Sequence, residues 1–185
     1  MKEPKHPRMG KEFPYTDQIL LLSAVLFFAV WISDSFVFRL SDRFVGVVPD
    51  VVRIAFFVGL EISAVVLGFY SHEALFGKKN VKFTLITDGV FAHVRHPLYL
   101  SILLAYLGFF FGSMSLVSLI PCICYAVLFD KMASYEEEDL VRIFGDKYIE
   151  YSKRVPKWFP TPLRKNSREQ MSKDVEGDRV DRHLP

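Results

Sequence analysis

The sequence predicts an all-α fold, a multi-pass integral membrane bundle of four clear transmembrane helices, or five. Of the 185 residues 51% are hydrophobic, yet 24% are charged, and the charges are segregated along the chain. No Lys, Arg, Asp or Glu occurs from Pro97 to Phe129, and Asp34 is the only charged residue from Gln18 to Phe38. Soluble domains spread charge over every element, because almost every helix and strand has a wet face. The pattern therefore excludes an ordinary soluble enzyme, a secreted disulfide scaffold and a disordered chain.

The first two helices follow a polar, basic N-terminal segment, residues 1–17. We place the first helix at Gln18–Phe38 and the second at Val47–Tyr70, so that residues 18–71 form an N-terminal helix pair. Each run reaches the roughly 20 apolar residues that cross a bilayer. The first run is also too long for the apolar core of a signal peptide.

The uncharged block after Pro97 would be about 50 Å long as a single helix, which is too long for one crossing. Gly112-Ser113 offers a break near its middle. The block therefore predicts a helical hairpin with arms Leu98–Phe111 and Met114–Lys131. Each arm is short, so the helices are expected to tilt, or one of them to continue into the polar segment beyond.

The segment Tyr135–Lys157 is amphipathic, with an apolar stripe at spacings of three and four. The stripe consists of Leu140, Phe144, Tyr148, Tyr151 and Val155. Such a stripe indicates a helical face that lies on the membrane or on the bundle. Residues 72–165 form the C-terminal membrane region, and the polar tail 166–185 is expected to be disordered.

The distribution of Lys and Arg predicts the orientation. Four helices place the N-terminus, the 71–97 connection and the C-terminal part on one side, which carries most of the Lys and Arg. The positive-inside rule then predicts that both termini face the cytoplasm, at the cell membrane if the chain is prokaryotic. A net charge of +2 without a basic stripe argues against nucleic acid as a partner.

A first polar cluster precedes the hairpin and contains Gly89-Val90-Phe91 and Arg95-His96-Pro97-Leu98-Tyr99. Pro97 suits the first position of a helix, where its missing N–H costs nothing. Arg95 and His96 then stand just before a helix N-terminus, which favours an anion. The alternative is that both side chains only anchor the helix at the headgroup level.

A second polar cluster follows the hairpin and contains the acidic run Glu136–Asp139, then Tyr148, Tyr151 and Arg154. Each part also has an explanation without a function. The acidic run could be a solvated surface, the two tyrosines could be packing residues, and Arg154 could simply be exposed.

Taken in order, these motifs resemble the isoprenylcysteine carboxyl methyltransferase family, within the wider group that includes phospholipid methyltransferases. The motifs are Gly-Val-Phe, Arg-His-Pro-x-Tyr, Glu-Glu-x-x-Leu, Phe-Gly-x-x-Tyr-x-x-Tyr and Arg-Val-Pro, between Leu85 and Pro160. The chain looks like a short, prokaryotic-type member. It departs from the wider group at Ser101, where Gly is frequent, and its first two helices match only as membrane helices.

The resemblance implies methyl transfer from S-adenosylmethionine, which leaves S-adenosylhomocysteine, to a lipophilic acceptor at the cytoplasmic membrane face. The acceptor group would be the carboxylate of an isoprenylcysteine. The site would lie in residues 72–165, outside the soluble Rossmann fold, and the chain has no G-x-G-x-x-G motif.

The predicted roles follow from this chemistry. Arg154 would hold the acceptor carboxylate through two hydrogen bonds, and Glu137 would act beside it in the catalytic site. The predicted cofactor-binding residues are Gly89, Val90, Arg95, His96, Tyr99, Glu136, Glu137, Tyr148 and Tyr151. One sequence leaves open which of the two glutamates contacts the cofactor.

Other interpretations stay open. A phospholipid amine or another isoprenoid lipid could be the acceptor, and an amine would need a base, for which Glu137 is the candidate. A non-catalytic membrane scaffold is the alternative of another class. Glu61 lies in the middle of a predicted membrane helix, where a charge is costly, and three explanations are open: a functional role, a protonated carboxyl, or a partner on another helix. Asp34 lies nearer a helix end and is expected to reach the membrane interface. We expect no metal, because His72-Glu73 is followed by Phe76 where a zinc protease motif needs His.

Overall fold

The computed structural model describes residues 13–41, 46–76 and 84–159, which form helices and connecting turns without a strand among them. The α-helices are α1 (Thr16–Ile32), α3 (Asp50–Phe76), α4 (Pro97–Ser113), α5 (Leu119–Phe144) and α6 (Asp146–Arg154). A π-helical turn η1 (Ser33–Phe38) extends α1, and the short 3₁₀ helices η2 (Gly89–Ala92) and η3 (Leu116–Ser118) precede α4 and α5.

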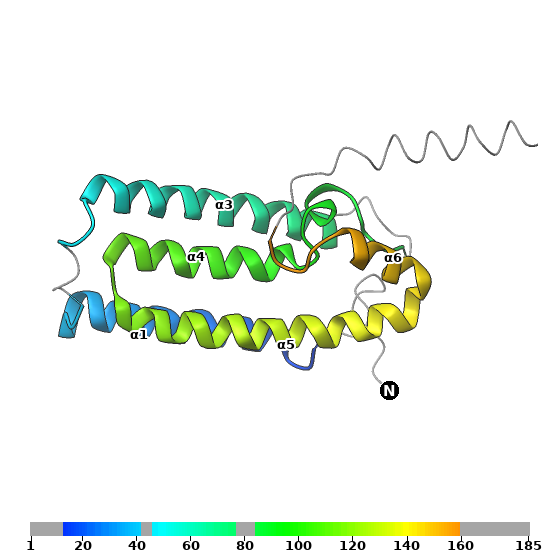
Figure 1. Cartoon of the computed structure of the whole chain (residues 1–185). Coiled ribbons are helices and arrows are strands. Elements are labelled where there is room, and N and C mark those ends of the chain that lie inside the picture. The colour runs from blue at the N-terminus through cyan, green and yellow to red at the C-terminus, as the bar shows by residue number, and fades with distance from the viewer. Residues whose placement is uncertain (1–12, 42–45, 77–83, 160–185) are drawn as a thin grey trace, which may run out of the picture.

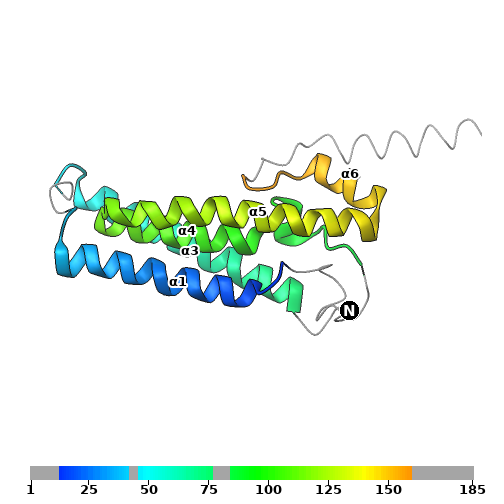
Figure 2. The same ribbon diagram turned by 90° about the horizontal axis from the view of Figure 1, so that it is seen from below.

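The four long helices run side by side as an up-and-down bundle, with the short α6 at one end (Figures 1 and 2). Helix α4 packs against α3, α5 and α1. Three segments are long and apolar enough to cross a membrane, Thr16–Phe38, Asp50–Phe76 and Leu116–Phe144, and α4 is a shorter apolar helix of 17 residues. The predicted all-α membrane bundle is confirmed, with α4 as its short member.

Small residues let α3 and α4 approach closely. A Cβ added at Gly68 would lie 3.3 Å from the Ser101 hydroxyl, and one added at Gly112 would lie 3.1 Å from the Phe57 ring. Small residues at helix contacts are the usual basis of tight packing in membranes, where lipid offers no hydrophobic driving force. Ser101 is therefore small for a packing reason.

On its other side, α4 joins α1 through an aromatic contact and hydrogen bonds. The Phe27 and Tyr106 rings stack with centroids 4.1 Å apart. The hydroxyls of Tyr106 and Ser23 lie 3.0 Å apart. Nearer the polar end, Tyr99 of α4 joins the core of Phe129, Met132 and Ala133 from α5.

The end of the bundle away from α6 is fastened by Asp34. Its carboxylate accepts hydrogen bonds from the hydroxyls of Ser41 at 2.6 Å and Ser115 at 2.5 Å, and from the main-chain N–H of Leu40 at 3.0 Å. Asp34 is only 2% exposed. The expectation that it reaches the interface is wrong, because two buried hydroxyls and one main-chain N–H hold it between η1 and the α4–α5 turn.

The helix boundaries differ from the predicted ones where a residue takes up a left-handed or related conformation. Helix α4 ends at Ser113, within the predicted break Gly112-Ser113, and Met114 caps it with φ 55°. Helix α5 continues through the acidic run to Phe144. This agrees with the alternative prediction that one arm of the hairpin continues into the polar segment. A single helix over Tyr135–Lys157 is wrong, because Gly145 with φ 55° and ψ −131° separates α5 from α6.

The apolar stripe nevertheless faces inward. Tyr148, Tyr151 and Val155 of α6 and its exit form one cluster with Leu140, Phe144 and Leu85. The stripe therefore packs on the bundle. The predicted disordered tail 166–185 and most of the basic segment 1–17 lie outside the described residues.

Candidate functional site

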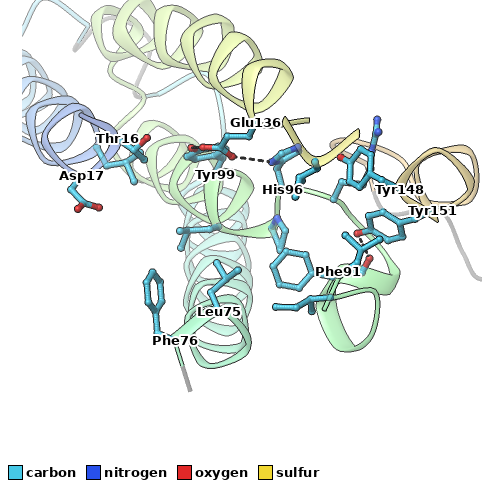
Figure 3. A pocket seen from close by; sticks show the side chains of 17 residues that line it. Thr16, Asp17, Leu75, Phe76, Phe91, His96, Tyr99, Glu136, Tyr148 and Tyr151 are labelled. Carbon is cyan, nitrogen blue, oxygen red and sulfur yellow. Dashed lines mark hydrogen bonds and ion pairs between the residues drawn. The ribbon is translucent and has the colours of Figure 1, made fainter. Parts of the chain in front are cut away.

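The start of α1, the end of α3, the start of α4, the polar half of α5 and α6 come together at one end of the bundle (Figure 1). A pocket lies between them (Figure 3). These segments are far apart in the sequence, and the up-and-down topology brings them to the same end of the helical bundle. The lining consists of Thr16, Asp17, Leu20, Leu75, Phe76, Leu85, Ile86, Phe91, Arg95, His96, Pro97, Leu98, Tyr99, Glu136, Leu140, Tyr148 and Tyr151.

Glu137 ties the start of α4 to α5. Nε2 of His96 lies 2.8 Å from Oε1 of Glu137, and Nη1 of Arg95 lies 3.2 Å from Oε2. Because an ionised carboxylate can only accept, Nε2 of His96 carries the hydrogen of its bond. Pro97 begins α4 as predicted, which leaves the two preceding residues free to turn toward α5.

Glu136 faces a different partner. The hydroxyl of Tyr99 donates to Oε1 of Glu136 at 2.5 Å, and Nδ1 of His96 lies 3.8 Å from Oε2 (Figure 3). The His96 and Tyr99 rings stack with centroids 6.0 Å apart. His96 thus lies between two carboxylates, Glu136 on the pocket side and Glu137 behind it.

Arg95 keeps one donor without a partner. Its Nε is buried and has no hydrogen-bond partner within the described part of the chain, whereas Nη1 is held by Glu137. A buried guanidinium N–H without an acceptor is costly unless a ligand satisfies it. Arg95, which lines the pocket, therefore keeps one buried N–H donor available.

Two tyrosines of α6 close the pocket opposite α1. The Tyr151 hydroxyl donates to the main-chain oxygen of Phe91 at 2.7 Å, and Tyr148 and Tyr151 are 2% and 4% exposed. Burial raises the pKa of both phenols well above the ordinary value, and the nearby Glu137 charge acts in the same direction. Both tyrosines are therefore neutral walls of the pocket.

Most of the predicted site residues meet here. Arg95, His96, Tyr99, Glu136, Tyr148 and Tyr151 line the pocket, and Glu137 supports it from behind.

Besides Glu137, three further predicted residues lie outside the lining. Gly89 is exposed and has φ 59°, a conformation that favours glycine, and Val90 follows it in η2. Arg154 is exposed at the end of α6, where its Nε makes a long bond of 3.4 Å to the carbonyl of Glu150. The structure brings none of these three side chains to the pocket wall.

Sequence reasoning missed the wall that the first two membrane helices contribute. Thr16, Asp17 and Leu20 come from α1, and Leu75 and Phe76 come from α3. The signal that could have found them is topology, because an even number of crossings returns these helix ends to the side that holds the polar motifs. Among residues 13–41, 46–76 and 84–159, no group of three His, Cys, Asp or Glu side chains is placed to share a metal ion.

The model of the phospholipid methyltransferase family matches residues 51–147, just over half of the chain. The chain belongs to the phospholipid methyltransferase family. The matched range contains nearly all of α3, the Arg95–Tyr99 motif, α4, η3 and α5, and therefore the hydrogen bonds from Arg95, His96 and Tyr99 to Glu136 and Glu137. The family resemblance recognised from the motifs is thereby confirmed.

Two relatives within or near this family are informative. The protein-S-isoprenylcysteine O-methyltransferase of Schizosaccharomyces pombe is 34% identical over 87 residues, which cover 45% of this chain and 36% of that protein. The methanethiol S-methyltransferase of Pseudomonas deceptionensis is 29% identical over 158 residues, which cover 80% of this chain and 59% of that protein.

A solved structure shows the same fold. The eukaryotic intramembrane Ras methyltransferase, isoprenylcysteine carboxyl methyltransferase, superimposes with a TM-score of 0.57 at 18% identity, over 80% of this chain and 54% of that one. In each of these three comparisons the aligned part spans well under two thirds of the other protein's length. The likeness to the solved structure concerns the fold alone.

Proposed function

We propose that this phospholipid methyltransferase family member transfers a methyl group from S-adenosylmethionine to a lipophilic acceptor at the cytoplasmic face of a membrane. The first candidate acceptor is the carboxylate of an isoprenylcysteine-like molecule, which the name of the Schizosaccharomyces pombe relative supports. The observation that carries the proposal is the pocket itself, in which a His96–Glu136–Arg95 polar wall faces apolar residues at one end of a membrane bundle. The site would belong to a cell membrane if the chain is prokaryotic.

The residues present fit the proposed cofactor. The unpartnered Nε of Arg95 suits the cofactor's carboxylate, Glu136 suits its ammonium or ribose hydroxyls, and Tyr148 and Tyr151 offer aromatic walls. S-adenosylmethionine supplies an activated methyl group on a sulfonium, so the hard chemistry is the cofactor's. Glu137 holds the Arg95 and His96 side chains in position for binding.

The work left to the protein is orientation and exclusion of water. A prenylcysteine carboxylate has a pKa near 3.5 and is ionised at neutral pH, so this acceptor needs no general base. Arg154 is proposed to bind that carboxylate, because its side chain is exposed at the exit of α6 and only its Nε makes a hydrogen bond to another described residue, a long one to the carbonyl of Glu150.

The apolar part of the pocket lining supports a lipophilic acceptor. Leu20 of α1, Leu75 and Phe76 of α3 and Leu98 of α4 line the pocket together with the polar residues. These residues belong to helices long enough to cross a membrane or to the apolar α4, so we propose that the apolar wall opens toward lipid. An acyl or prenyl chain could occupy it while the reactive group meets the polar wall.

A phospholipid amine is the second candidate acceptor, and Asp17 favours it. Asp17 and Glu136 place two carboxyl side chains in the lining, whereas the Arg95 guanidinium and the His96 ring are already bonded to Glu137. An acidic lining attracts an ammonium headgroup and repels a carboxylate. Glu137 was the predicted base for an amine, but its bonds to Arg95 and His96 give it a supporting position behind the wall.

Binding of S-adenosylhomocysteine tests the proposal. Calorimetry with the full chain in detergent should detect binding. If no binding occurs at millimolar ligand, the non-catalytic scaffold replaces the methyltransferase as the favoured hypothesis. A farnesylcysteine analogue and phosphatidylethanolamine, offered side by side with labelled cofactor, then separate the acceptors. Transfer to the amine alone would replace the carboxylate as substrate.

A further inference from the structure

The segment that leaves α6, residues 155–159, turns back along the bundle and is fastened to α5 at Asp130. Nζ of Lys157 donates to Oδ1 of Asp130 at 2.7 Å and to its main-chain oxygen at 2.9 Å, and also reaches Oγ of Ser134 at 2.8 Å. Nε1 of Trp158 donates to the same Oδ1 at 2.8 Å. We call residues 155–159 the strap and Asp130 its clasp.

The strap touches the candidate site at three points. Val155 packs in the cluster of Tyr148 and Tyr151. The main-chain oxygen of Pro156 accepts from the N–H of Arg95 at 3.0 Å. The Trp158 ring lies 6.0 Å from that of His96, at an interplanar angle of 41°. The strap therefore contacts both the α6 wall and the Arg95–His96 corner.

Neither the clasp nor the strap lines the pocket, so they can act on it only through these neighbours. Helix α6 has only nine residues, which is too short to be stable alone, so its position depends on packing and on its two ends. One end is the Gly145 turn and the other is the strap. Without the clasp, the last turn of α6 would behave like a chain end that frays.

The clasp is stronger than an ordinary surface ion pair. Exposed pairs contribute little, because solvent screens them and two side chains must be ordered. Here one carboxylate receives both the ammonium and the indole donor, and the Lys157 side chain is only 18% exposed although that of Asp130 is 51% exposed. Lys157 also lies 5.8 Å from the centroid of the Trp158 ring.

We propose that Asp130 is a positioning residue, which holds the strap so that Tyr148, Tyr151 and Arg95 keep the arrangement that binds the cofactor. This inference rests on the proposed function. Opening the clasp frees the main chain at Pro156 and loosens the α6 wall. The expected result is a rise of roughly tenfold in the dissociation constant of S-adenosylhomocysteine, the size of one lost charged hydrogen bond.

The experiment uses the full chain with Trp31→Phe, so that Trp158 is the remaining tryptophan. Asp130→Asn, Lys157→Met, their double variant and the reversed pair Asp130→Lys with Lys157→Asp are compared by two readouts. The readouts are calorimetry with S-adenosylhomocysteine and Trp158 emission. Arg142→Met is the matched control, because it removes another cation paired with an α5 carboxylate, at 3.2 Å from Asp139, but outside the strap.

If the clasp exists, Trp158 emission should shift to the red and S-adenosylhomocysteine should bind more weakly in both single variants. The double variant should show changes no larger than either single variant. The reversed pair should recover part of the affinity and part of the emission shift. Arg142→Met should change neither readout. Unchanged emission in the single variants overturns the clasp, and shifted emission with unchanged affinity overturns the positioning role. A parent chain that binds no S-adenosylhomocysteine overturns the proposed function and with it the positioning role, while the emission series still reports on the clasp.

Discussion

Nε2 of His96 lies 2.8 Å from Oε1 of Glu137, which joins the residue before α4 to α5 across 41 positions of the sequence. The same carboxylate holds Arg95 at 3.2 Å. One side chain thus holds both Arg95 and His96 of the described pocket lining. The arrangement makes Glu137 the residue on which the geometry of the polar wall depends.

Glu137→Gln should weaken S-adenosylhomocysteine binding by at least roughly tenfold and lower the unfolding temperature. The amide has one acceptor where the carboxylate has two, so Arg95 or His96 loses a charged hydrogen bond, each worth about 1.5–3 kcal/mol. Calorimetry and thermal unfolding in detergent measure the two effects. Glu138→Gln, at an exposed position of the same acidic run, is the control. Equal affinities in the two variants would remove Glu137 from the site.

The raised pKa values of Tyr148 and Tyr151 predict a pH effect on stability. Folded protein holds these protons more tightly than the unfolded chain, whose tyrosines titrate near pH 10. Their contribution is therefore fully present below about pH 10 and is lost as the pH rises above it, at up to about 1.4 kcal/mol per pH unit for each tyrosine. Unfolding followed from pH 9 to pH 11 should show a smaller decline in the double variant with both tyrosines changed to Phe. An identical decline would mean that neither phenol is protected.

The sequence predicted the hairpin, the helix start at Pro97 and most of the polar wall, because these depend on local patterns. The split of Glu136 toward Tyr99 and of Glu137 toward Arg95 and His96 could not be predicted. Adjacent residues on a helix point about 100° apart, and only the placement of α4 against α5 decides which acid meets which partner. Asp17 and Phe76 were missed for the same reason, since they reach the pocket through helix packing.

The contact between Glu61 and Gly108 predicts a rescue experiment. A Cβ at Gly108 would lie 2.5 Å from Oε1 of Glu61, an oxygen that is buried and has no hydrogen-bond partner in the described part of the chain. Gly108→Ala should therefore force the Glu61 side chain to move and destabilise the α3–α4 contact by about 1 kcal/mol, the low end for overpacking because the end of a flexible side chain can shift, and adding Glu61→Ala should restore much of the loss. Unfolding by sodium dodecyl sulfate in mixed micelles measures both. Additive losses in the double variant would contradict the contact.

Asp34 predicts a loss of stability that is separate from the site. Asp34→Ala leaves the buried hydroxyls of Ser41 and Ser115 without this acceptor, and each unsatisfied buried group costs about 1–3 kcal/mol. The unfolding temperature should fall, while the protein that stays folded binds S-adenosylhomocysteine with unchanged affinity, because Asp34 lies at the far end of the bundle. Asp50→Ala, whose side chain is 79% exposed, is the control. A parallel loss of affinity and stability would show that the two ends are coupled.

Arg154 tests which acceptor the enzyme takes. If its guanidinium grips an acceptor carboxylate, Arg154→Ala should lower kcat/KM for a farnesylcysteine analogue by about 10²-fold or more, through loss of a charged bidentate pair. Binding of S-adenosylhomocysteine should not change, because Arg154 does not line the pocket. Lys153→Ala, an exposed neighbour on the same helix, is the control. Activity close to that of the unchanged chain would exclude Arg154 from the acceptor site.

Asp17→Asn then decides the acceptor's charge, since removing this carboxylate should favour an anionic acceptor and disfavour an ammonium.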